Sequence, residues 1–140
     1  MTYARAAVAA LGGALVMWLL AGAWHEIVAS RLYADRIQDE HQGVGLIFLA
    51  YCVLALLMTF FLRHARLSQR PFVQGAVLGS IIGILWVFPH ELALAAAHGE
   101  PLRYVFVNAA WHVVEQGTGG IVIAVSMYAL ARVRRPPLEG

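Results

Sequence analysis

Six ionisable side chains lie inside long apolar stretches of this sequence, and their types could do chemistry. They are three histidines and three glutamates, namely His25, Glu26, His90, Glu91, His112 and Glu115. Burying such groups in an apolar medium is costly unless they are paired or hydrogen-bonded. The same stretches have no Lys, and their one Arg, Arg132, lies at the very end of the last stretch. We therefore expect the six to pair with each other, hold protons, contact water or bind a cation.

A metal centre is the first interpretation of this set. Neutral imidazoles with a carboxylate suit Zn²⁺, iron or copper, and two imidazoles facing each other across a helix bundle could hold a haem. The predicted ligands are His25, His90, His112, Glu115, Glu91 and Glu26. The expected cofactor is accordingly a transition metal ion or haem.

His112 and Glu115 also support two other interpretations. They are three residues apart, so they share one face of a helix. As catalytic acid and base they could serve a proton-linked small-molecule transporter or a lipid-modifying isomerase. Alternatively, the polar groups only specify assembly, and the protein is a structural or accessory subunit of a membrane complex. His25, Glu26, His90 and Glu91 also have a simpler interpretation, as hydrated groups near a membrane surface.

Composition fixes the class of protein that carries these groups. The chain has 140 residues, 61% hydrophobic and 13% charged, with a mean hydropathy of +0.70. Soluble domains have about 25% charged and roughly 45–50% apolar residues. A disordered chain, a nucleic-acid-binding domain and an ordinary soluble enzyme are thereby excluded. The single Cys52 excludes a disulfide framework and cysteine-rich metal sites. An integral membrane protein remains.

Four apolar runs are long enough to cross a bilayer, which takes about 20 residues. They cover residues 6–29, 43–62, 72–98 and 104–133. The predicted fold is an all-α, antiparallel four-helix transmembrane bundle, forming one domain over residues 1–133. Residues 134–140 are predicted to be a disordered basic tail.

The arginines predict the orientation of the spans. With four crossings, seven arginines fall on one side of the membrane, namely Arg5, Arg63, Arg66, Arg70, Arg132, Arg134 and Arg135. The other side has three arginines and four acidic residues in its two loops. By the positive-inside rule both termini are cytoplasmic, as expected for a multi-pass protein of the bacterial inner membrane. Ala21-Gly22-Ala23 resembles a signal-peptide cleavage site, but the apolar run is long for a signal, so we expect a retained helix.

Glycines predict how the helices pack. Gly75, Gly79 and Gly83 recur every four residues, a spacing that lets transmembrane helices approach closely. Gly117 and its neighbours Gly119 and Gly120 either allow the same close approach of the last span or loosen the helix there. The expected partners are the lipid bilayer and either further copies of this chain or other subunits of a membrane complex.

The chain resembles small, uncharacterised four-span bacterial membrane proteins. The resemblance rests on Trp24-His25 at the end of the first span and on Glu100-Pro101-Leu102 leading into the segment Asn108-Ala109-Ala110-Trp111-His112. It implies the four-span architecture and no activity. Sequence motifs of zinc proteases, serine hydrolases, nucleotide-binding loops and membrane desaturases are absent from the sequence.

Overall fold

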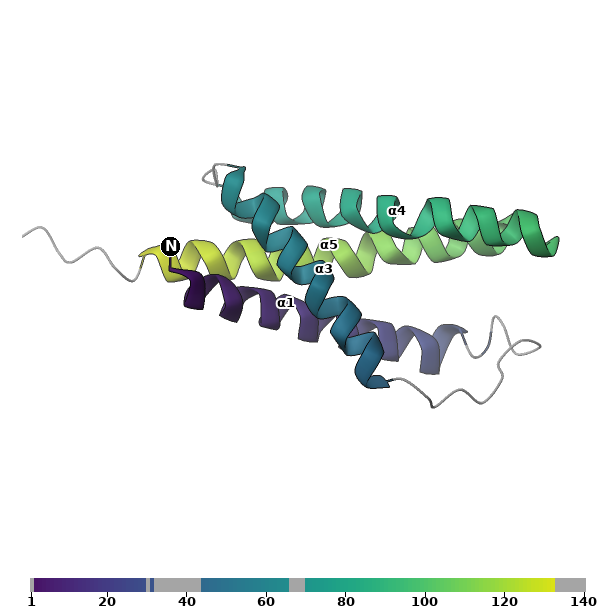
Figure 1. Cartoon of the computed structure of the whole chain (residues 1–140), viewed down its shortest axis with the longest axis horizontal. Coiled ribbons are helices and arrows are strands. Elements are labelled where there is room, and N and C mark those ends of the chain that lie inside the picture. Colours follow the sequence, from purple (N-terminus) through teal and green to yellow (C-terminus); the bar gives the residue numbers. More distant parts are fainter. Residues whose placement is uncertain (1, 30, 32–43, 66–69, 133–140) are drawn as a thin grey trace, which may run out of the picture.

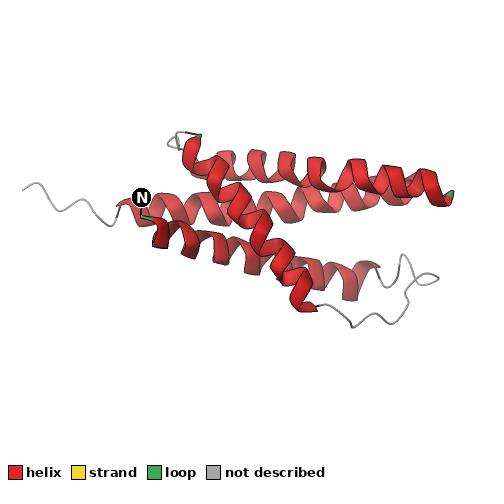
Figure 2. Cartoon of the chain, viewed as in Figure 1, coloured by secondary structure: helices red, strands yellow, loops and turns green. Residues whose placement is uncertain are grey.

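The protein is all-helical over the residues described by the computed structural model, which are 2–29, 31, 44–65 and 70–132. Its elements are α1 (Tyr3–Ala23), continued by the π-helix η1 (Trp24–Ala29), then α3 (Val44–His64), α4 (Pro71–His98) and α5 (Leu102–Arg132) (Figure 2). All four long helices are long and apolar enough to cross a membrane. Many of their large apolar side chains are exposed, as lipid-facing residues would be.

Local sequence signals set the limits of α4. Pro71 occupies the first turn, where its fixed φ suits a helix and its missing N–H costs nothing. Gly99 ends the helix in the left-handed conformation at φ 67°, which a residue with a Cβ adopts at a cost. Pro101 follows and prevents the helix from continuing.

Helix α5 is the centre of the arrangement (Figure 1). It packs along α4 on one side and along α1 on the other, and it also contacts α3. Within the described residues α1 and α4 do not contact each other. Helix α3 runs diagonally across the others, so the bundle is less regular than four parallel rods (Figure 1).

Helices α4 and α5 meet through the predicted glycine surface. A Cβ on Gly75 would overlap the backbone of Gly120, and a Cβ on Gly79 would overlap the carbonyl oxygen of Gln116. A Cβ on Gly83 would lie 2.7 Å from the carbonyl oxygen of His112. Successive glycines along α4 lie against successively earlier turns of α5, so the two helices are antiparallel. The small-residue packing predicted from the sequence is confirmed.

Helices α1 and α5 are antiparallel as well. Gly13 faces Ile123, and Met17 fills the space beside Gly119. At the arginine-rich end, Arg5 donates a hydrogen bond of 2.7 Å from Nη1 to the carbonyl oxygen of Leu130. This bond satisfies one of the last carbonyls of α5, which have no partner within the helix.

The structure agrees with the prediction of four packed, membrane-length helices and differs in detail. The last turn of the first span is π-helical rather than α-helical. Helix α3 extends to His64 and α4 begins at Pro71, both slightly outside the predicted limits. The predicted tail, 134–140, lies outside the described residues. Which end of the bundle is cytoplasmic stays a prediction.

Candidate functional site

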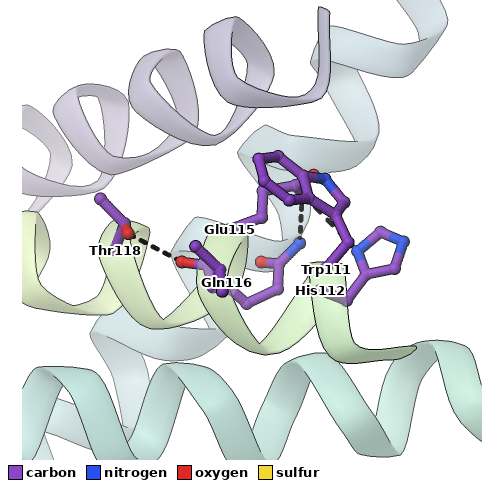
Figure 3. Close-up of polar contacts among 6 residues, drawn as sticks. Trp111, His112, Glu115, Gln116 and Thr118 are labelled. Carbon is purple, nitrogen blue, oxygen red and sulfur yellow. Dashed lines mark hydrogen bonds and ion pairs between the residues drawn. The ribbon is translucent and has the colours of Figure 1, made fainter. Parts of the chain in front are cut away.

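The strongest polar feature is Glu115, at the place where the other helices meet α5. Its side chain is 1% exposed. Oε2 accepts a 2.9 Å hydrogen bond from Nε1 of Trp111, one turn earlier on α5. Oε1 accepts a 2.8 Å hydrogen bond from Nε2 of Gln116 (Figure 3). Tyr51 of α3 lies close to the carboxylate. Trp111 and Gln116 are neutral donors, so they satisfy the buried carboxyl oxygens without adding a charge.

Gln116 reaches Glu115 because α4 has no side chain in its way. The residue is 1% exposed, and a Cβ on Gly83 would lie 2.7 Å from its Cγ and 2.8 Å from its Cβ. The close approach of the two helices therefore shapes the site as well as the fold. The carbonyl oxygen of the Gln116 amide, Oε1, is buried and has no hydrogen-bond partner.

His112 lies beside the same carboxylate. Its Nδ1 is 3.7 Å from Oε1 of Glu115, beyond hydrogen-bonding distance. Nδ1 is buried and has no partner, whereas the side chain as a whole is 18% exposed. The imidazole therefore extends from the surface of the bundle to the buried carboxylate.

A ring pair joins α1 to this network. Trp24, the first residue of η1, stacks on Trp111 with ring centroids 4.5 Å apart and ring planes 11° apart. Trp111 in turn donates to Glu115. Residues 111–116 of α5 thus have three neighbours from other elements, namely Trp24 of η1, Tyr51 of α3 and Gly83 of α4.

The arrangement suits a group that gains and loses a proton. A neutral imidazole with its hydrogen on Nε2 presents a lone pair at Nδ1 to the lone pairs of the carboxylate. A proton on Nδ1 of His112 or on Oε1 of Glu115 would allow a hydrogen bond between these two atoms. The bond requires that the 3.7 Å distance between them shorten slightly. The Gln116 amide can donate to the ionised carboxylate or, turned by half a rotation, accept from the protonated one.

Of the six predicted site residues, the structure brings two together, His112 and Glu115. His25, Glu26 and His90 are exposed, and Glu91 is half-buried. Among the residues that the structure describes, no three His, Cys, Asp or Glu side chains are grouped so that they could hold a metal ion. Transition-metal sites in proteins use three or four protein ligands. The described residues therefore do not assemble the predicted donor set, and the metal or haem hypothesis stays an untested prediction.

Three partners of Glu115 were not predicted as site residues. Trp111 donates a hydrogen bond to the carboxylate, and Tyr51 of α3 lies close to it. Gln116 was not singled out. A glutamine directly beside a glutamate in an apolar span was the signal that could have drawn attention to it.

Comparisons with protein-family models, with curated proteins and with solved structures gave no match to this chain. The class of this protein is therefore inferred from its own sequence and structure. Over the described residues it is all-helical, with four membrane-length helices packed together and a buried glutamate among them.

Proposed function

We propose that this protein binds a proton reversibly at Glu115 and His112 and conducts it across the membrane, as part of proton-linked transport of a small molecule. The supporting observation is that Nδ1 of His112, which is buried and has no hydrogen-bond partner, lies 3.7 Å from Oε1 of the buried Glu115. Intramembrane ionisable residues commonly mark proton relays and substrate paths.

His112 gives the buried carboxyl a route for protons. The exposed part of its ring can exchange a proton with water, and Nδ1 can pass it to Oε1 of Glu115. A neutral imidazole can take up a proton at one nitrogen and release one from the other. Glu115 in turn contacts residues of α3 and α5, so its charge acts on more than one helix.

Proton flux into vesicles tests this proposal. The purified protein is reconstituted into liposomes that contain a pH-sensitive dye, and a potassium diffusion potential, negative inside, drives protons inward. The wild type should acidify the vesicles faster than protein-free liposomes do. Glu115→Gln should abolish the excess rate, because the amide cannot take up a proton but keeps the shape of the side chain.

Two control variants separate this effect from a general loss of structure. Glu100→Gln removes a carboxylate from an exposed position after α4, and His64→Ala removes an exposed imidazole at the end of α3. Both should retain the wild-type rate. A wild-type rate equal to that of protein-free liposomes would contradict proton conduction and favour the isomerase or the structural subunit. Unchanged flux in Glu115→Gln would remove Glu115 from the path.

A further inference from the structure

Trp24 and Trp111 stack on each other beside the proposed proton site, and Trp24 has no role in proton binding as proposed above. The rings are stacked in parallel, 4.5 Å between centroids. Both residues are half-buried. Nε1 of Trp111 donates a 2.9 Å hydrogen bond to Glu115. The orientation of the indole ring therefore determines the direction of this N–H bond.

The position of Trp24 follows from the packing of α1. Met17 and Ala21 lie on the buried face of this helix, and Trp24 continues it three residues later. Gly119 faces Met17, and two turns before Gly119 along α5 lies Trp111. The ring pair therefore extends the interface between α1 and α5 beyond the contact of Met17 with Gly119.

The π-helix begins at this contact. Trp24 is the first residue of η1, and the following His25 and Glu26 are exposed whereas Trp24 is half-buried. A π-helical turn shifts the register of the side chains that follow it, and such turns occur often at functional sites. Here the change from α-helix to π-helix comes at Trp24, the residue that stacks on Trp111.

From this geometry we infer that Trp24 is a positioning residue, which holds the Trp111 indole so that its N–H stabilises the ionised form of Glu115. The inference rests on the proposed proton site. The other titratable groups that contact Glu115 in the described part of the chain are His112 of α5 and Tyr51 of α3. Trp24 stacks on Trp111, and Gly83 lies against Gln116; neither Trp24 nor Gly83 is titratable.

Infrared spectroscopy of the reconstituted protein over a range of pH provides the test. The band of the protonated Glu115 carboxyl is identified by its loss in Glu115→Gln. Trp111→Phe keeps a ring and removes the donor, so the carboxyl should bind its proton roughly tenfold more tightly, as expected when a hydrogen bond to a charged group is lost. Trp24→Leu should shift proton binding in the same direction, and Trp24→Phe, which can still stack, should stay near the wild type.

Trp86→Leu is the matched control, because Trp86 is 60% exposed on α4, and it should leave the band unchanged. If Trp111→Phe shifts proton binding and Trp24→Leu does not, the inference is wrong while the proton site stands. If the wild type has no titrating band that Glu115→Gln removes, the proposed function fails. Ultraviolet resonance Raman spectroscopy of the Trp111 N–H then still tests the positioning role of Trp24. The hydrogen bond of this N–H should weaken in Trp24→Leu, and an unchanged Raman band would contradict the positioning role.

Discussion

Replacing Gly79 by alanine tests how closely α4 and α5 are packed. The new Cβ would overlap the backbone oxygen of Gln116 and lie 2.8 Å from its carbonyl carbon and 3.0 Å from Cα of Gly117. A flexible side chain can rotate away from such an overlap, whereas a backbone carbonyl within a helix cannot. The two helices must therefore move apart.

The magnitude follows from two opposing contributions. Overpacking costs about 1–3 kcal/mol, and replacing a helical glycine by alanine gains roughly 0.5–1 kcal/mol. The difference is about 0–2.5 kcal/mol, and because the overlap is with backbone, Gly79→Ala should lower the free energy of unfolding by an amount in the upper half of that range. Gly83→Ala should cost less, because its closest neighbours include the Gln116 side chain, which can move.

Unfolding by denaturant in detergent micelles measures these differences. Gly22→Ala is the matched control: nothing lies within 4 Å of its added Cβ, so the free energy of unfolding should stay equal or rise. Gly12→Leu should also be milder than Gly79→Leu, because a Cβ on Gly12 meets only Cγ1 of Val122 at 3.8 Å. Equal stability of Gly79→Ala and Gly22→Ala would refute the close helix contact.

Three further predictions concern the rest of the molecule. A reporter enzyme that works only in the cytoplasm should be active when fused after Gly140 and inactive when inserted near Gln38; activity at both positions would contradict four crossings. Arg5→Ala should lower the free energy of unfolding by about 1 kcal/mol in the same detergent assay, because the carbonyl of Leu130 loses its donor, and an unchanged value would show that the bond contributes nothing. Elemental analysis and an absorption spectrum decide the metal hypothesis: the proton site predicts equal, substoichiometric metal in the wild type and in His112→Ala, whereas one equivalent lost in His112→Ala would establish a metal centre.

The sequence was sufficient to predict four helices, because their apolar runs leave few alternatives. It also predicted the α4 face at Gly75, Gly79 and Gly83, since a four-residue spacing places these glycines on one side of a helix. His112 and Glu115 were expected to lie together for the same reason. Each of these predictions depends on periodicity within one helix.

Contacts between helices could not be predicted in this way. The stacking of Trp24 on Trp111 and the approach of Tyr51 to Glu115 depend on the register and crossing angle of separate helices. The sequence predicts that His25 and His90 join His112 as ligands, but the presence of a histidine in an apolar stretch does not fix the direction in which its side chain points. The structure leaves both imidazoles exposed.

The central claim is that His112 and Glu115 share a proton, and nitrogen-15 NMR of the histidine-labelled protein in bilayers tests it most directly. The Nδ1 signal of His112 is assigned by its loss in His112→Gln and followed with pH. We expect it to change with pH in the wild type and to follow a different pH course in Glu115→Gln, because the carboxyl oxygen 3.7 Å away is replaced by an amide. A His112 signal that does not change with pH, or that is the same in both proteins, would contradict the shared proton.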